Sequence, residues 1–509
     1  MGRLNWVTTA CCIFLMWAAA AVALPAQTYT TLHNFDGTDG ANPAAVLLQA
    51  TNGNLYGTTE FGGTDGCYDE RGCGTIFQIT PSGDLTRIYT FCSQGSNDCT
   101  DGFAPKAGLI QGTDGSLYGT TYGNAAEGSC TYAGDCGTVF KITPSGELTT
   151  LYSFCSQSGC TDGSFPEAGL VQGTDGNFYG TTTAGGVNDS CNYGEPCGTV
   201  FKITPSGALT TLYSFCSQAD CADGEDPDAG LVQGTNGNFY GTTDGGGIDH
   251  NGTVFQITPG GSFTSLHSFN GEDGASPQAG LVLGADGNFY GTTYDEGSHS
   301  SGTAFEITPS GALTTLYDFC SRMAHGICAD GDGPTTKLVQ GTDGGFYGTT
   351  LAGGANICDE FSSCGIIFRI SPSGTLTRLH SFDSTDSDAA AGLVQGTNGN
   401  FYGTTFIGGG GGCLPQGYGC GTVYGLSVGS GPFVETNPVA AKVGTTVGIL
   451  GTALTGATGV KFNGTATAFR VVSSTFIEAK VPSGATSGKV QVKLPSGTLV
   501  SNVPFIVLP

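Results

Sequence analysis

Short apolar stretches alternate with turn residues through most of the chain, and four kinds of stretch recur in a fixed order. In residues 168–215 they read GLVQGT, NFYGTT, GTVFKI and LTTLYSF, which we name segments A, B, C and D. Val, Ile, Tyr, Phe and Thr in short runs bounded by turns are typical of β-strands. The pattern predicts an all-β fold in which each repeat supplies four strands.

The tetrapeptide YGTT marks seven repeats. It begins at Tyr56, Tyr118, Tyr179, Tyr240, Tyr290, Tyr347 and Tyr402. Asn-Gly or Asp-Gly stands between A and B in every copy, and this pair suits the positive φ angles of a tight hairpin. Pro-Ser-Gly or Pro-Gly-Gly between C and D is a second turn signal. Seven four-stranded repeats favour a seven-bladed β-propeller over the alternative, an open solenoid.

The two ends of the repeat region predict a closed ring. A lone D-type segment, TTLHNF, occupies residues 30–35, whereas the seventh copy ends after its C segment near residue 426. We expect the N-terminal segment to complete the last four-stranded unit, which would remove a free sheet edge.

The chain divides into three parts. Residues 1–26 form a predicted signal peptide, with Arg3 before an apolar run over residues 11–24 and small residues suited to cleavage. Residues 28–428 form the repeat domain. After Gly-Ser-Gly at residues 429–431, alternating stretches such as TTVGIL and KVQVKL predict a second β domain over residues 432–509. We therefore expect a secreted or cell-surface protein.

Charge and hydropathy exclude two classes of partner. The formal net charge is −26, with 16 Lys and Arg against 42 Asp and Glu, so a nucleic acid backbone would be repelled. No stretch after the leader reaches the roughly 20 apolar residues of a membrane span. We expect neither nucleic acid binding nor a membrane span, and we expect a monomer.

Apart from Cys11 and Cys12 in the leader, the cysteines fall into nine local pairs, five in B to C loops and four in D to A loops. The two members of a pair are present or absent together, which favours disulfides over zinc ligands in an exported chain. The pairs are Cys67 and Cys73, Cys92 and Cys99, Cys130 and Cys136, Cys155 and Cys160, Cys191 and Cys197, Cys216 and Cys221, Cys320 and Cys328, Cys358 and Cys364, and Cys413 and Cys420.

Six D to A loops contain Asp-Gly-x-x-Pro, and the seventh reads TDSDAA at residues 385–390. Because the loop leads into segment A, the expected innermost strand, its Asp residues could ring the mouth of the channel and hold a hard cation such as Ca²⁺. A role within the turn is the favoured alternative, since Asp before Gly often bonds its own turn backbone. The residues are Asp39, Asp101, Asp162, Asp223, Asp273 and Asp330.

No catalytic constellation is evident in the sequence. His33, His267 and His380 stand at the D position held by Tyr in other copies, and His250, His299 and His325 lie in variable loops. No nucleophile motif, metal signature or phosphate loop accompanies them. We expect no catalytic residues and no cofactor, with Ca²⁺ the one ion that the Asp loops would suit.

The blocks DGNxYGTT, GTVFxITPSG and LTxLYSF, repeated over residues 30–427, resemble the bacterial GloVer tandem-repeat family, named for Gloeobacter and Verrucomicrobia. The resemblance implies exported, often surface-associated proteins and supplies no catalytic residues. Residues 432–509 resemble an IPT/TIG domain through Pro438, Gly444, Gly451, the FNG at residues 462–464, Pro482 and Gly488. That resemblance implies an Ig-like sandwich that serves as a spacer or adhesion unit.

Variable loops on a rigid scaffold are where binding usually resides. The D to A and B to C loops share one face and hold all the paired cysteines. We therefore expect a non-catalytic binding or structural protein that engages an extracellular glycan or protein through this face. A polysaccharide-active hydrolase or lyase is the alternative, because paired acids suited to it are abundant.

Overall fold

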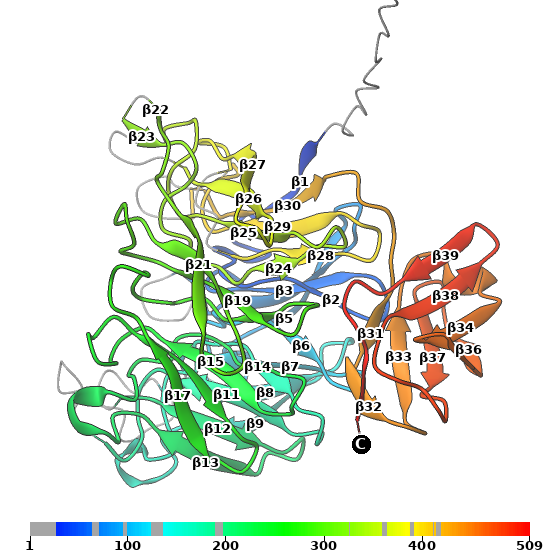
Figure 1. Ribbon diagram of the computed structural model, residues 1–509, viewed down its shortest axis with the longest axis horizontal. Coiled ribbons are helices and arrows are strands. Elements are labelled where there is room, and N and C mark those ends of the chain that lie inside the picture. The colour runs from blue at the N-terminus through cyan, green and yellow to red at the C-terminus, as the bar shows by residue number, and fades with distance from the viewer. Residues whose placement is uncertain are drawn as a thin grey trace, which may run out of the picture.

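The computed structural model describes residues 27–63, 71–94, 99–123, 136–188, 197–324, 326–358, 364–386, 391–410, 412–413 and 419–508. The predicted signal peptide lies outside these residues. Within them, the repeat region forms seven four-stranded antiparallel sheets in a propeller-like arrangement (Figure 1).

Each sheet uses its strands in the order A, B, C and D, and the bounds repeat closely. The A strands are β2 (Leu48–Gln49), β6 (Ile110–Gln111), β10 (Val171–Gln172), β14 (Val232–Gln233), β18 (Val282–Leu283), β24 (Val339–Gln340) and β28 (Val394–Gln395). The B strands are β3 (Leu55–Thr59), β7 (Leu117–Thr121), β11 (Phe178–Thr182), β15 (Phe239–Thr243), β19 (Phe289–Thr293), β25 (Phe346–Thr349) and β29 (Phe401–Thr405).

The outer half of each sheet is equally regular. The C strands are β4 (Thr75–Ile79), β8 (Thr138–Ile142), β12 (Thr199–Ile203), β16 (Thr253–Ile257), β20 (Thr303–Ile307), β26 (Ile366–Ile370) and β30 (Thr422–Ser427). The D strands are β5 (Leu85–Thr90), β9 (Leu148–Ser153), β13 (Leu209–Ser214), β17 (Phe263–Ser268), β21 (Leu313–Asp318), β27 (Leu376–Ser381) and, from the N-terminus, β1 (Thr28–Asn34). The D to A loops add η1 (Ser158–Cys160), η2 (Ala219–Cys221), β22 (Met323–Ala324) and β23 (Ile327–Cys328).

The A strands lie nearest the axis of the ring, because the residues just before them approach one another between sheets. A Cβ atom added to Gly169 would lie 3.2 Å from the carbonyl oxygen of Gly108, and one added to Gly230 would lie 3.1 Å from that of Gly169. Gly392 of the seventh repeat is equally close to Val46 of the first, whose Cγ2 would lie 3.0 Å from the added atom. Glycine thus permits the inner strands to meet around the axis.

Aromatic stacking joins neighbouring sheets farther from the axis. In five places the Tyr of YGTT packs on the Phe that precedes the same Tyr in the next repeat, as in Tyr118 with Phe178, whose centroids are 4.1 Å apart, and Tyr179 with Phe239 at 3.9 Å. In the first and second repeats this position holds Leu55 and Leu117. The B-strand aromatics therefore pack between neighbouring repeats. A Gly follows each Tyr because a Cβ at Gly57 would lie 2.5 Å from Cζ of Phe77.

The N-terminal strand closes the ring, as the sequence predicts. Strand β1 pairs antiparallel with β30, from Thr28 opposite Ser427 to Asn34 opposite Thr422. The glutamines of the A strands form a second link: the Thr51 N–H donates to Gln111 Oε1 of the next repeat at 2.9 Å. The Thr397 N–H of the seventh repeat donates to Gln49 Oε1 of the first at 2.8 Å. The same pattern of bonds therefore crosses the join between the chain ends.

The C-terminal region consists of two four-stranded sheets around one apolar core. One sheet has the order β31 (Glu435–Asn437), β33 (Thr446–Leu450), β37 (Phe476–Lys480) and β36 (Phe469–Val471). The other has the order β35 (Thr465–Thr467), β34 (Gly459–Phe462), β38 (Val490–Leu494) and β39 (Gly497–Val500). Strands β32 (Ala440–Lys442) and β40 (Ile506–Leu508) pair in parallel, and η3 (Leu454–Gly456) follows β33. Ile449, Ile477 and Val492 are fully buried between the sheets.

The C-terminal region is bonded to the A to B turns of the repeat region. Thr475 Oγ1 donates to the Thr51 carbonyl at 2.9 Å, and the Phe433 N–H donates to the Thr397 carbonyl at 3.0 Å. Asn437 Nδ2 reaches the Gln111 carbonyl at 3.3 Å. These bonds join the C-terminal region to the first, second and seventh repeats.

The ring closure can be tested by comparing Q49L with Q111L. Both substitutions remove an acceptor for a backbone N–H of the neighbouring repeat, and the fifth repeat already carries Leu283 at this position. Each should lower the free energy of unfolding by about 1 kcal/mol, measured by urea denaturation. If Q111L destabilises the protein and Q49L does not, the first and seventh repeats are not joined.

Glu435 predicts a pH-dependent stability. Burial raises the pKa of its carboxyl to about 7, above the unfolded value of about 4.3. The folded state therefore binds the proton more tightly, and Glu435 destabilises the fold increasingly as pH rises from about 4 to about 7, with no further change above that. E435Q should gain stability relative to the native protein over this interval.

The measurement is the difference in unfolding free energy between E435Q and the native protein from acid to neutral pH. E478Q, at an exposed ion pair with Arg470, is the matched control. A difference for E435Q that stays flat with pH would contradict the assignment.

Candidate functional site

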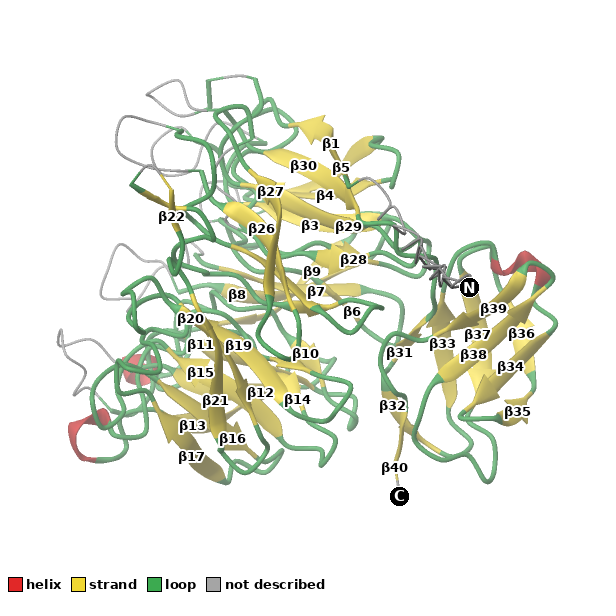
Figure 2. Cartoon of the chain, turned by 45° about the horizontal axis from the view of Figure 1, so that its top comes forward, coloured by secondary structure: helices red, strands yellow, loops and turns green. Residues whose placement is uncertain are grey.

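The ring has two unequal faces. In antiparallel sheets of this order the B to C and D to A loops emerge together, on what we call the disulfide face, and the A to B and C to D turns form the hairpin face. In Figure 2 the D to A turns η1 and η2 lie on the opposite side of the ring from the C-terminal region. The bonds to the C-terminal region described above all fall on the hairpin face. Within the described residues the disulfide face is left uncovered.

The paired cysteines staple this face. Six of the nine predicted pairs are joined among the described residues: Cys92–Cys99, Cys155–Cys160, Cys216–Cys221, Cys320–Cys328, Cys358–Cys364 and Cys413–Cys420. Cys73, Cys136 and Cys197 are also disulfide-bonded, and their predicted partners Cys67, Cys130 and Cys191 lie outside the described residues. So many disulfides indicate an oxidising environment.

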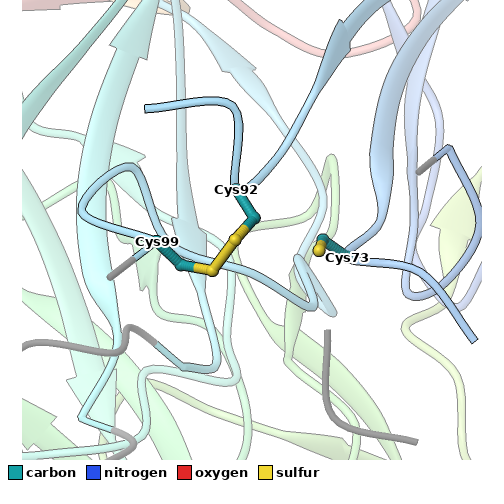
Figure 3. A group of neighbouring side chains, drawn as sticks. All are labelled: Cys73, Cys92 and Cys99. Carbon is teal, nitrogen blue, oxygen red and sulfur yellow. A yellow bond between two sulfur atoms is a disulfide. The ribbon is translucent and has the colours of Figure 1, made fainter. Parts of the chain in front are cut away.

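Two groups of sulfur atoms resemble metal sites in spacing. The Sγ atoms of Cys73, Cys92 and Cys99 lie within 4.8 Å of one another (Figure 3). Those of Cys197, Cys216 and Cys221 form a second group with the same spacing. All six are in disulfides, and zinc needs thiolates. Each group therefore consists of the disulfide of a B to C loop packed against the disulfide of a D to A loop.

The Asp residues of the D to A loops hold those loops to the outermost strand. Asp162 Oδ2 accepts hydrogen bonds from the Tyr152 hydroxyl at 2.8 Å and the Ser156 N–H at 3.0 Å. Asp101, Asp223 and Asp330 accept the corresponding bonds from Tyr89, Tyr213 and Tyr317 of their D strands. The carboxylates are almost wholly buried beside the D strand, so they do not form the ring around the axis that the loop order suggested.

Histidine replaces Tyr in the other three repeats without changing this arrangement. His33 Nε2 lies 2.7 Å from Asp39 Oδ2, and His267 Nε2 lies 2.8 Å from Asp273 Oδ2. In the seventh loop, which lacks Asp-Gly-x-x-Pro, Asp386 takes the same position, 3.2 Å from the ring of His380. The Asp-Gly-x-x-Pro motif does not identify Asp386. The role of the Asp is its hydrogen bond to the Tyr or His of the D strand, and this bond does not require the Gly and Pro that follow.

The remaining histidines do not gather at a site. His250 and His299 are exposed in loops of the disulfide face, and His325 lies outside the described residues.

No helix within the described ranges is long and apolar enough to cross a membrane.

An arc of carboxylates lies on the disulfide face, in the segments that follow the B strands or lead into the A strands. Lys106 Nζ is 3.3 Å from Glu167 Oε1 and 3.8 Å from the centre of the Tyr122 ring. Electrostatic interactions link these groups to the other carboxylates of the arc, from the first repeat to the sixth. We define the axial arc as Glu60, Glu167, Asp228, Asp244, Asp295 and Asp332.

Burial makes several of these carboxyl groups unusual. It raises the pKa of Asp228 well above its ordinary value, with repulsion from Glu167 and Asp244 adding to the effect. It also raises the pKa of Glu60, Asp244 and Asp332. Oδ1 of Asp244 is buried and has no hydrogen-bond partner among the described residues. Such groups can accept hydrogen bonds from ligand hydroxyls.

Sequence reasoning did not single out the axial arc. Glu60 and Asp244 directly follow YGTT, and Glu167 and Asp228 directly follow the Pro of the D to A loop. Asp295 lies one position farther from YGTT, and Asp332 lies two residues before the loop Pro. One position carries Glu60, Tyr122, Thr183, Asp244, Tyr294, Leu351 and Phe406 in successive repeats. Variation at such positions, between otherwise regular strands, is the signal that could have identified this site.

Comparison with known proteins gives one family match and several structural likenesses. The family model described as Gloeobacter/Verrucomicrobia repeat matches residues 20–194 and 189–424. No curated protein matches the chain. A fungal alcohol oxidase of the AA5 family, solved in complex with copper, is similar at 12% identity and a TM-score of 0.53, over 94% of this chain and 99% of its own.

Two bacterial structures are less similar. A putative 6-phosphogluconolactonase from Bacteroides uniformis shares 15% identity at a TM-score of 0.41, over 67% of this chain and 86% of its own. A protein from Lactobacillus plantarum shares 18% identity at a TM-score of 0.40, over 67% and 84%. At these identities the likenesses concern the fold alone.

The buried Asp residues predict a large structural effect and a small calcium effect. D162A would leave the Tyr152 hydroxyl and two loop N–H groups without their acceptor, and should lower the free energy of unfolding by about 2 to 4 kcal/mol. Because the carboxylate is already saturated with donors, millimolar Ca²⁺ should leave the melting temperature of the native protein unchanged.

Thermal melting of the native protein, D162A and D249A, an exposed Asp of the same face, provides the measurement. A saturable rise in melting temperature with Ca²⁺ that D162A abolishes would show that the loop Asp residues are cation ligands.

Proposed function

The chain belongs to the Gloeobacter/Verrucomicrobia repeat family, and from that premise and the asymmetry of its two faces we propose that it is an exported, non-catalytic glycan-binding protein. The repeat region is a seven-bladed β-propeller, and the C-terminal region is an Ig-like domain of the IPT/TIG type that acts as a spacer. The ligand is an extracellular glycan held on the disulfide face, at the axial arc.

The single observation that carries this proposal is the placement of the axial arc. Carboxylates accept hydrogen bonds from the many hydroxyl groups of a sugar, and those of the arc are partly shielded from water. The C-terminal region contacts the other face, and disulfides hold the loops around the arc.

The same arc favours a glycan over a protein partner. The centre of a protein interface is depleted of charged residues, whereas the centre of this face carries Glu167, Asp228 and Asp244. A protein ligand would have to bury these carboxylates against matching cations.

A polysaccharide-active enzyme is the second candidate, and one observation favours it. A carboxyl group with a strongly raised pKa, such as that of Asp228, beside a second carboxyl group, here Glu167, resembles the acid and base of glycoside hydrolases. Binding and turnover are therefore measured together.

The test applies the exported chain to an array of polysaccharides and then assays each bound polymer for new reducing ends. We expect binding without release of reducing ends. D228N should weaken binding several-fold, because an amide cannot replace the carboxylate as a hydrogen-bond acceptor on both oxygens.

The matched control is D175N, on the hairpin face, where other repeats already carry Asn52, Asn236 and Asn398. Its affinity should equal that of the native protein. If D228N binds the glycan as tightly as the native protein, the placement of the site is wrong. If no glycan on the array binds, the proposed function is wrong. If the native protein releases reducing ends and D228N does not, the enzyme is favoured.

A further inference from the structure

One repeat departs from the others at the axis. The residue two positions before the A strand is Gly108, Gly169, Gly230, Gly280 or Gly392 in five repeats and Val46 in the first. The sixth repeat has Lys337 at this position. Glycine satisfies the packing of the inner strands, as the close approach of Gly230 to Gly169 shows, so the fold does not require a lysine there.

The side chain of Lys337 lies against the preceding repeat, near the axis of the ring. Its Cδ would be 3.7 Å from a Cβ atom on Gly280 of the preceding repeat, so it extends along the neighbouring inner strand. The residue is exposed to solvent, yet protein surrounds its ammonium group. A side chain that points into solvent at the centre of the ring would be both exposed and surrounded by protein.

Lys337 has no partner for its charge. Within the described residues its ammonium makes no hydrogen bond and no ion pair, in contrast to Lys106 and Lys141, which pair with Glu167 and Asp114. The carboxyl groups of the axial arc interact with one another and with Lys106, and desolvation alone lowers the pKa of Lys337. A bound anion would stabilise an ammonium that protein surrounds and that no counter-ion balances.

We propose that Lys337 is an anion-binding residue on the axis of the ring and that its ligand is a carboxylate. A single ammonium supplies three N–H donors and one positive charge, which matches a monoanion. A phosphate or sulfate dianion would leave an unbalanced negative charge in a protein that already carries −26.

The carboxylate can come from two sources. It can belong to a uronic sugar, whose hydroxyl groups then reach the axial arc; this case rests on the proposed glycan function. It can also belong to a small free carboxylate such as acetate, a case that does not depend on that function.

The experiment measures binding of D-glucuronate, D-glucose and acetate to the full exported chain by NMR titration, slightly below neutral pH so that the amine is protonated. K337G tests the site and restores the residue used by five other repeats. K337R keeps the charge, and K202Q is the control, because Gln78 and Gln256 occupy the position of Lys202 in other repeats.

We expect glucuronate to bind the native protein and K202Q equally, K337G about tenfold or more weakly, and K337R with affinity largely retained. Glucose should show no dependence on Lys337. Acetate binding that requires Lys337 would identify a site for free carboxylates, whereas binding of glucuronate alone would identify a site for uronic sugars; both support the inference.

Equal glucuronate affinity in K337G and the native protein, no binding of either carboxylate, or displacement of both by equimolar chloride would overturn it. If neutral glycans bind on the array while both carboxylates fail, the inference fails and the proposed function stands. If carboxylates bind through Lys337 while no glycan binds on the array, the proposed function fails and the inference stands.

Discussion

The close approach of the inner strands around one axis is the constraint on which the rest of the structure depends. The carbonyl of one repeat lies where a side chain of the next would begin, as between Gly108 and Gly169, so the sheets can meet only where the side chain is absent or leaves the contact. Once the inner strands meet, the aromatic pairs such as Tyr179 and Phe239 fix the spacing of the sheets farther out. The bond from Thr397 to Gln49 shows that this spacing also holds between the first and last repeats.

The same regularity separates structural residues from candidate functional ones. A role that recurs in every repeat is a role in the fold, and the Asp residues beside the D strand meet this criterion, with Tyr or His as the partner. Residues that differ between repeats at one position have no such role, and the axial arc and Lys337 belong to this class. The disulfides constrain the conformation of the loops on this face.

Much of the fold could be predicted from the sequence. Turn residues such as Asn52-Gly53 and the lone D-type segment at the N-terminus define local structure, and local structure repeated seven times determines the order of strands. The distance of a side chain from the axis could not be predicted in this way. Asp101 lies in a loop that leads to the innermost strand, yet its carboxylate bonds Tyr89 on the outermost one, because the loop crosses the full width of the sheet.

The candidate site was harder to predict for the same reason. Glu60 and Asp228 are far apart in the chain and lie in different kinds of loop, and the arrangement of the repeats around one axis brings both near Glu167. Lys337 is one cation among 16 basic residues, and its significance appears only when its position is known to be axial. A repeat alignment combined with the ring geometry identifies such residues, and neither does so alone.

The most direct test of the account is hydrogen exchange in strand β30, because closure of the ring depends on its pairing with β1. Amides of Thr422–Ser427 that face β1 should exchange as slowly as those of β26 that face β27, its equivalent in the sixth repeat. Exchange in β30 as fast as that of an unpaired strand edge would show that the chain ends are not joined and would contradict the closed ring.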